Sequence, residues 1–508
     1  MKSTDINEMM TSQNYLESLK DDREVYIYGE KVPDITTHSA FKNGVHSISK
    51  LYDALHTPDS KEIMTSIDKD GYRTHRFFMP SYSNDDLLKA REAIAYWSRL
   101  TYGFMGRTPD YKAGFTATLQ SESNLYNPFH DNAINWYRKI THNVMFLSHV
   151  LVNPPIGRGM AISDMRDIYL HVEKEIDSGI IVRGVKMVAT GAVFSNAVFV
   201  AQNSATQYQT NREEDFALCF ILPINAPNLK IICRRSYESS ALSPFDNPLS
   251  SRFDENDSVL IFDGVFVPWE NILIYRDIDR AKKFYSDSGF LNRYPLQSGT
   301  RVAVKLDFIC GLLSKVLLSN GTASFRGVQV KLAEIFALRN LMWSLTESLC
   351  FNPEKRKDGS VVPRSEIATT VRYFGTQVMS QIKPIFNTIL GGSPIMQPSS
   401  WLDIQNLDLN NLINQYFQGN NQKSNDRLKL IKLLWDALGS EFANRHEIYE
   451  YNYAGNNEQV RLDMLQQCKN SGVLEQCHSL VEKCMLDYSL SGWNDLGWSF
   501  DGICHDQR

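Results

Sequence analysis

The spacing of apolar residues changes twice along this chain, and that change constrains the fold more than any other feature of the sequence. Residues 1–150 carry apolar side chains at helical spacing, residues 151–280 resemble strands, and residues 281–508 return to helical spacing. We therefore predict three domains with these boundaries. A three-part arrangement of this kind creates clefts between domains, where ligand sites are common.

The first zone contains two clear helix signals. Asn84–Gly103 has an amphipathic pattern, and Ser83 or Asn84 can cap its first turn. A second helix is expected from about Asn132 to Leu151. Between the two, glycine and proline punctuate the segment MGRTPDYKAGFTATL, which predicts an ordered loop with one helical turn.

The middle zone contains short segments rich in Val, Ile and Phe, separated by turn residues. This pattern is typical of an antiparallel sheet or barrel. The segments are GIIVRGVKMVATGA, NAVFVAQNS, DFALCFILPI, LKIICRRSY and SVLIFDGVFVPWENILI. The loop Asn203–Asp215 is long and polar, and a long loop inside a compact β-domain is often functional.

The last zone predicts a helical bundle, because four long segments carry apolar stripes. They are Arg301–Leu318, Ser324–Phe351, Ser365–Leu390 and Leu428–Tyr453. Gly391, Gly392 and an Asn/Gln-rich stretch at 419–425 interrupt them.

The composition excludes several classes of protein. Lys and Arg total 53 and Asp and Glu total 58, so the net charge of −5 argues against a nucleic-acid partner. No apolar run approaches the ~18 residues that a membrane helix needs. The polar, acidic start of the sequence does not resemble a signal peptide, and the eight cysteines form no CxxC pair. We therefore expect a cytoplasmic protein with reduced thiols.

The familiar cofactor and metal motifs are absent. The sequence contains neither GxGxxG nor a Walker motif, and neither HExxH nor GxSxG. Histidine does not occur between His171 and His446. The C-terminal Cys468, Cys477 and Cys484 are nine and seven residues apart, which does not match zinc-ligand spacing. We therefore predict no metal site.

Three polar residues in the first zone suggest a site. Arg107 and Tyr111 are four residues apart in GRTPDY, so one helical turn would point both side chains the same way. His149 follows in LSHVLVNPPIGR, inside the second expected helix. Spacing alone also allows a purely structural explanation, in which Arg107 pairs with an acid, Tyr111 packs and His149 lies in the core.

Five segments, in their order and separation, give a specific resemblance. They are RLTYGFMGRTPDY, SHVLVNPPIGR, GVKMVATGA, VLIFDGVFVPWENIL and LGSEFANRHEIYEYNYAG. Over roughly residues 10–490 the chain resembles the oxygenase components of two-component 4-hydroxyphenylacetate 3-monooxygenases. The resemblance implies an α+β multidomain fold like that of acyl-CoA dehydrogenases, with an N-terminal helical domain, a middle antiparallel β-barrel and a C-terminal four-helix bundle.

The resemblance also implies an activity. Family enzymes receive reduced FAD (FADH2) from a separate NAD(P)H:flavin reductase, form a flavin C4a-hydroperoxide with O2, and hydroxylate a phenol ortho to its hydroxyl. Arg107, Tyr111 and His149 match the catalytic residues that hydrogen-bond the phenol. Family members usually assemble as homotetramers, or otherwise as dimers.

The remaining site residues follow from the same resemblance. Further substrate contacts are expected from Ser204, Thr206 and Gln207. FAD contacts are expected from His149, Val150, Leu151, Pro155, Ile156, Gly157, Arg158, Thr190, Tyr453, Ala454, Gly455 and Asn456.

Other functions remain open from the sequence alone. One alternative is N-hydroxylation, or another oxygenation of a natural-product intermediate. An acyl-CoA dehydrogenase-like enzyme and a non-catalytic scaffold agree less well with the Arg107, Tyr111 and His149 set. The related 4-hydroxybutyryl-CoA dehydratases need N-terminal cysteine ligands, and this chain has no cysteine before Cys219.

Overall fold

The computed structural model describes residues 8–157, 159–202, 208, 211–495 and 497–498. Its N-terminal part is mainly helical. The elements are α1 Ser12–Ser18, β1 Glu24–Ile27, β2 Glu30–Lys31, α2 Lys42–Ala54, α3 Pro58–Met64, β3 Thr65–Ile67, β4 Arg73–His75, α4 Asn84–Leu100, α5 Ala113–Ser121 and α6 His130–Asn143. Ser83 caps α4 as expected, since its hydroxyl accepts the backbone N–H of Asp86 at 3.1 Å.

Two local predictions in this part are wrong. The second expected helix, α6, stops at Asn143 because Val144 adopts a left-handed conformation with φ 52°. The apolar residues that follow form strand β5 (Leu147–Val150), which carries His149. The loop around GRTPDY contains the short 3-10 turn Pro109–Tyr111 and then a full helix, α5, where only one turn was expected.

The middle part contains the expected strands. Besides β5 they are β6 His171–Ile176, β7 Gly179–Lys186, β8 Ala197–Val200, β9 Leu218–Pro223, β10 Leu229–Cys233, β11 Ser258–Pro268 and β12 Ile272–Tyr275. They form a six-stranded sheet, in the order β2-β1-β10-β11-β7-β6, and a four-stranded sheet, in the order β12-β9-β8-β5.

The pairing differs from a purely antiparallel arrangement. β1 pairs with β10 in parallel, and β5 pairs with β8 in parallel, with His149 opposite Phe199. Parallel neighbours need long crossover connections, and these two strands come from the N-terminal 150 residues. The N-terminal segment therefore contributes strands to both sheets, and the domain division at residues 150 and 280 stays a prediction.

The C-terminal part is helical, as expected. Its helices are α7 Ile278–Asp287, α8 Phe290–Ser319, α9 Arg326–Ser348, α10 Ser365–Leu390, α11 Trp401–Gln405, α12 Leu407–Tyr416, α13 Ser424–Leu438, α14 Glu441–Asn452, α15 Asn457–Asn470 and α16 Val473–Leu486. The fourth predicted long helix is broken at Gly439 into α13 and α14. A side chain at Gly439 would collide with the Trp435 ring, at 2.4 Å.

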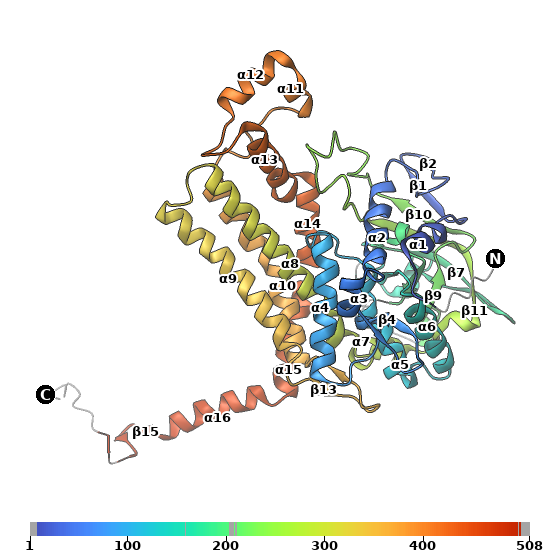
Figure 1. Ribbon diagram of the computed structural model, residues 1–508. Helices are drawn as coiled ribbons and strands as arrows, with labels where there is room; N and C mark the ends of the chain where they lie inside the picture. Colours follow the sequence, from blue (N-terminus) through green and yellow to red (C-terminus); the bar gives the residue numbers. More distant parts are fainter. Residues whose placement is uncertain (1–7, 158, 203–207, 209–210, 496, 499–508) are drawn as a thin grey trace.

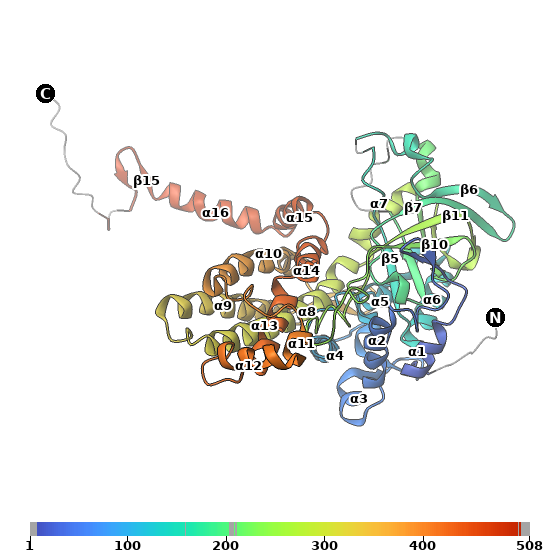
Figure 2. The same ribbon diagram turned by 90° about the horizontal axis from the view of Figure 1, so that it is seen from above.

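Helices α8, α9 and α10 run side by side, and α4 packs against α8 where the bundle meets the rest of the molecule (Figure 1). In both views α16 extends away from this body (Figures 1 and 2). Among the described residues, no helix combines the length and apolarity needed to cross a membrane.

Candidate active site

Arg107 and Tyr111 lie together, as their spacing predicts. The Cζ atom of Arg107 is 3.7 Å from the centroid of the Tyr111 ring and 5.3 Å from that of Tyr449 on α14. The Nε and NH1 atoms of Arg107 are buried and have no hydrogen-bond partner among the described residues. The guanidinium therefore stacks between aromatic rings and keeps donors free for a ligand.

His149 completes this group from the neighbouring sheet. Its ring stacks on Tyr111, with centroids 5.8 Å apart and planes at 18°. Burial, followed by the nearby Lys112 and Arg107, holds the pKa of His149 well below its ordinary value. The imidazole is therefore neutral near pH 7 and can accept a hydrogen bond from a phenol.

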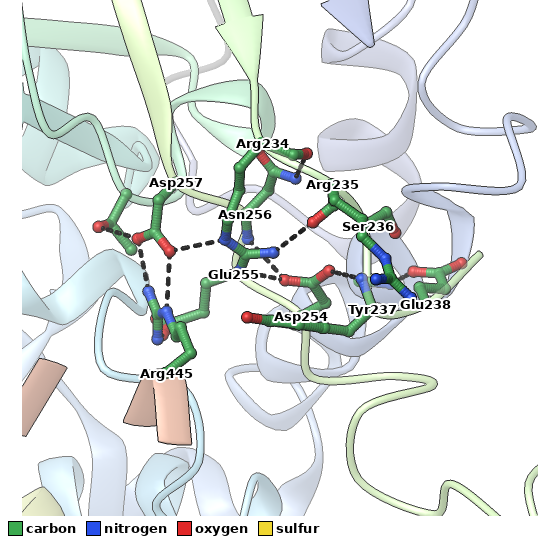
Figure 3. Close-up of polar contacts among 12 residues, drawn as sticks. Arg234, Arg235, Ser236, Tyr237, Glu238, Asp254, Glu255, Asn256, Asp257 and Arg445 are labelled. Carbon is green, nitrogen blue, oxygen red and sulfur yellow. Dashed lines mark hydrogen bonds and ion pairs between the residues drawn. The ribbon is translucent and has the colours of Figure 1, made fainter. Parts of the chain in front are cut away.

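Two carboxylates fix the loops on either side of this group. Glu255 accepts the backbone N–H of Arg107 at 2.5 Å, and Asp257 accepts the hydroxyl of Thr190 at 2.6 Å. Both acids precede β11, and both bind Arg445 of α14 (Figure 3). Burial alone would raise the pKa of Asp257, but Arg445 and Arg234 lower it below its ordinary value, so Asp257 stays ionised.

The expected flavin loop pairs with the segment that leads to Thr190. Val152 and Met187 exchange backbone hydrogen bonds of 3.2 and 2.9 Å, which place the segment after β5 beside the segment after β7. Val152, Ile156 and Val188 are 43%, 54% and 46% exposed, although they are apolar. Exposed apolar side chains of this kind suit a flat aromatic ring, and so fit a flavin.

The other residues of this loop are placed as follows. Val150 is buried within β5, and Leu151 is half-buried with its carbonyl accepting Lys186 at 3.2 Å. Pro155 and Gly157 flank the exposed Ile156. Arg158 lies outside the described residues, as do the substrate-loop residues Ser204, Thr206 and Gln207.

The C-terminal segment from which flavin contacts are expected reaches the group through one tyrosine. The carbonyl of Ala454 accepts the hydroxyl of Tyr294 at 3.4 Å, and the ring of Tyr294 is 6.3 Å from that of Tyr111. Tyr453 and Ala454 are buried, whereas Gly455 and Asn456 are exposed. The structure therefore brings this segment close to Arg107, Tyr111 and His149, with its last two residues at the surface.

Sequence reasoning missed several residues of the site, namely Lys112, Glu255, Asp257, Arg445 and Tyr449. Lys112 directly follows Tyr111, and its amine is 4.4 Å from the Phe290 ring centroid with no hydrogen-bond partner among the described residues. Glu255, Asp257 and Arg445 are ordinary charged residues in the sequence, so only the tertiary structure reveals their contacts. Arg445 and Tyr449 both lie in the segment LGSEFANRHEIYEYNYAG, which is the one signal in the sequence that could have found them.

One cluster among the described residues has donors that could ligate a metal: Asp68, Asp70 and His142. His142 Nε2 is 3.2 Å from Asp68, and Arg138 is 3.4 Å from Asp70. Each carboxylate thus already has a basic partner. The cluster carries no further argument for a metal.

The comparisons with known proteins agree with this geometry. The family description 4-hydroxyphenylacetate 3-hydroxylase N terminal matches residues 11–274, and the C-terminal description matches residues 281–482. Pyoverdin chromophore biosynthetic protein PvcC of Pseudomonas aeruginosa is 47% identical over 97% of this chain and 99% of its own length. A 4-hydroxyphenylacetate 3-monooxygenase oxygenase component from the same organism is 46% identical over 95% of this chain and 94% of its own length.

A solved structure extends the agreement to the fold. The crystal structure of the oxygenase component of 4-hydroxyphenylacetate 3-monooxygenase, complexed with FAD and 4-hydroxyphenylacetate, has a TM-score of 0.87 and 28% identity. The match covers 94% of this chain and 99% of that chain. The expected acyl-CoA dehydrogenase-like fold class and the expected resemblance are therefore confirmed. The chain belongs to the 4-hydroxyphenylacetate 3-hydroxylase family, the oxygenase components of two-component flavin monooxygenases.

Proposed function

We propose that this chain hydroxylates a phenolic substrate ortho to its hydroxyl group, with reduced FAD and O2. One observation carries the proposal: Arg107 has buried, unpartnered guanidinium nitrogens beside Tyr111 and a neutral His149. A buried cation whose donors are free favours a ligand that develops negative charge on oxygen, as a phenol does when it loses its proton.

Each residue of the group has a separate role. Arg107 stabilises the developing phenolate, because a fixed cation is most effective where water is excluded. His149 accepts the hydrogen bond or the proton of the phenol, which its neutral state permits. Tyr111 lies between them and orients the phenol oxygen, so that the ortho carbon faces the oxidant.

Reduced FAD, when bound, supplies the activation of dioxygen. The residues that we assign to FAD binding are Val150, Leu151, Pro155–Arg158, Thr190 and Tyr453–Asn456. The exposed apolar side chains of Val152 and Ile156 support this assignment, and the solved relative is itself complexed with FAD. A separate NAD(P)H:flavin reductase would deliver the reduced cofactor, consistent with the absence of a nucleotide-binding GxGxxG motif.

The substrate is a para-substituted phenol in this proposal. 4-Hydroxyphenylacetate is bound in the solved relative, and the PvcC name indicates that related chains also serve biosynthesis. Ser204, Thr206 and Gln207 remain the predicted contacts to the para substituent. Arg107 favours a phenol over an amine, because a guanidinium stabilises an oxyanion but repels an ammonium group.

The decisive test replaces the guanidinium. The purified chain, mixed with a flavin reductase, NADH, FAD and a panel of para-substituted phenols, is expected to form catechols. Arg107→Met should lower the kcat/KM for catechol formation on the order of 100-fold or more, because the phenolate loses its fixed cation. Chromatography of the products measures catechol formation by the wild-type protein and its loss in the variant.

A matched control separates chemistry from folding. Arg91 also stacks on an aromatic ring, with its Cζ 5.0 Å from the centroid of Trp343, but it lies outside the site. Arg91→Met should retain the wild-type rate per folded molecule. If the wild-type protein forms no catechol from any phenol of the panel, the proposed function is wrong.

We also propose that the chain assembles as a homotetramer, or otherwise as a dimer, in the cytoplasm. Helix α16 supports the assembly, since it extends away from the rest of the molecule (Figure 2). Leu480, Val481, Met485 and Leu486 on it are all more than half exposed. Exposed apolar clusters of this kind usually meet another chain. Light scattering of the purified protein measures the mass, and a monomer would contradict the proposal.

A further inference from the structure

We infer that Arg445 is a positioning residue that holds Arg107 and Thr190 in register with each other, through Glu255 and Asp257. The inference rests on the proposed function, since it concerns the alignment of the phenol-binding side with the expected flavin side. Arg445 belongs to α14, far from both partners in sequence, and lies within the segment LGSEFANRHEIYEYNYAG, where it was not among the expected site residues.

The guanidinium of Arg445 spans both carboxylates (Figure 3). Its NH1 donates to Glu255 at 2.9 Å, while its Nε and NH2 donate to the two oxygens of Asp257 at 2.8 and 2.6 Å. Three donors of a rigid planar fork are thus committed to two acids two residues apart. This geometry fixes the direction of the Glu255 side chain, and Arg445 shares the hold on Asp257 with Arg234, whose Nε donates to it at 2.9 Å.

Each acid uses its remaining lone pairs on a different part of the site. The second oxygen of Glu255 accepts the backbone N–H of Arg107 at 2.5 Å. Asp257 accepts the Thr190 hydroxyl at 2.6 Å. One guanidinium is therefore one hydrogen-bonded residue away from each of two site residues that come from separate segments of the chain.

The backbone joins the same segments. The N–H of Gly191 donates to the carbonyl of Asn256 at 3.0 Å, and the N–H of Ala189 donates to that of Ser258 at 2.8 Å. A side chain on Gly191 would lie 3.6 Å from Cβ of Arg107, so the two loops are packed directly together. A shift of the segment 255–257 would consequently move both loops.

Helix α14 contacts Arg107 a second time. Tyr449 lies one turn after Arg445, and its ring centroid is 4.9 Å from Cζ of Arg445 and 5.3 Å from Cζ of Arg107. The helix thus holds the main chain of Arg107 through Glu255 and packs against its side chain through Tyr449. The position of Arg107 therefore depends on how α14 packs against the sheets.

The test is Arg445→Lys, which keeps the positive charge but removes the planar set of guanidinium donors. The matched control is Arg235→Lys, because Arg235 also pairs with α14, at Glu441 3.5 Å away, but through side chains that are 62% exposed. Hydrogen exchange should accelerate at least tenfold at the Arg107 amide in Arg445→Lys and stay at the wild-type rate in Arg235→Lys. This readout needs neither cofactor nor substrate.

The second readout is the fraction of reduced FAD oxidation that yields hydroxylated product. A displacement of about 1 Å can lower a rate about 100-fold, so Arg445→Lys should divert most of the oxygen consumed to hydrogen peroxide. A purely structural residue would lower the amount of folded enzyme without changing this fraction. Arg235→Lys should keep the wild-type fraction.

The outcomes distinguish the two proposals. A folded Arg445→Lys protein with wild-type product fraction overturns this inference alone. A wild-type protein that hydroxylates no phenol overturns the proposed function and this inference with it. If Arg445→Lys does not fold, the test uses Glu255→Gln. This isosteric change removes one of the two carboxylate charges that pair with the Arg445 guanidinium, and it should give the same loss of product fraction.

Discussion

Two buried lysines near the site differ in one respect. Lys112 and Lys305 are each 1% exposed, but Lys305 is 3.0 Å from Glu450, whereas Lys112 has no hydrogen-bond partner among the described residues. An unsatisfied buried polar group costs about 1–3 kcal/mol. Lys112→Met should therefore raise the free energy of unfolding by about that amount, and Lys305→Met should lower it. Denaturant titration of both variants measures the difference, and a change of the same sign in both would contradict the explanation.

The lysine pair also shows what a residue-level pattern can predict. Arg107 and Tyr111 do lie together, as the spacing in GRTPDY predicts, although the 3-10 turn begins only at Pro109 and Arg107 precedes it. Lys112 also contacts Phe199 and Arg445 also binds Glu255, and these partners are 87 and 190 positions away in the sequence. Local spacing carries no information about such contacts. The roles of the site residues stay predictions.

Elements meet closely where the loop before the 3-10 turn contacts α14. A side chain at Gly106 would lie 2.4 Å from the hydroxyl of Tyr449, so only glycine fits against this helix. Gly106→Ala should lower the melting temperature and the hydroxylation rate, because α14 must move away from Arg107. Adding Tyr449→Ala should recover part of the loss, with a coupling of about 0.5–3 kcal/mol in a double-mutant cycle.

The control for this prediction is Gly327→Ala in α9, where a side chain would meet no atom within 4 Å. Alanine favours a helix over glycine by roughly 0.5–1 kcal/mol, so this variant should be neutral or more stable. Strictly additive effects of Gly106→Ala and Tyr449→Ala would show that the two positions do not compete for space.

The elements also separate what was predictable from what was not. Long amphipathic helices such as α4, α9 and α10 lie close to their predicted positions, because their period extends over several turns. The apolar run at 144–151 is too short for its period to separate a helix from a strand. This run forms a strand because it pairs with β8, which lies about 50 residues further on in the sequence.

The stability of the whole molecule depends on pH through buried groups whose contributions change in opposite directions. Burial lowers the pKa of His75 to about 3, so unfolding lets it bind a proton below pH ~6.5, and its contribution to stability falls as the pH falls. Burial raises the pKa of Asp110 to about 6, so the folded state binds a proton first and its contribution rises as the pH falls towards 4.

Variants isolate the two contributions. The stability gap between wild type and His75→Gln should narrow as the pH falls from 6.5 to 5, by about 1.4 kcal/mol per pH unit at most. The free energy of unfolding of the wild type minus that of Asp110→Asn should rise over the same range, because the contribution of Asp110 grows as the pH falls. Urea titrations at several pH values measure both gaps, and parallel curves for all three proteins would show that neither group titrates as described.

The parallel pairing of β1 with β10 has a consequence for synthesis of the chain. β1 leaves the ribosome first, but its partner follows roughly 200 residues later, which at about 5–20 residues per second is about 10–40 s. Of the strands that the structure describes, the two-residue strand β2 is the only other partner of β1 during this time. A chaperone that binds nascent strands would have its longest opportunity there, and slow translation near residue 230 should lower the yield of folded enzyme.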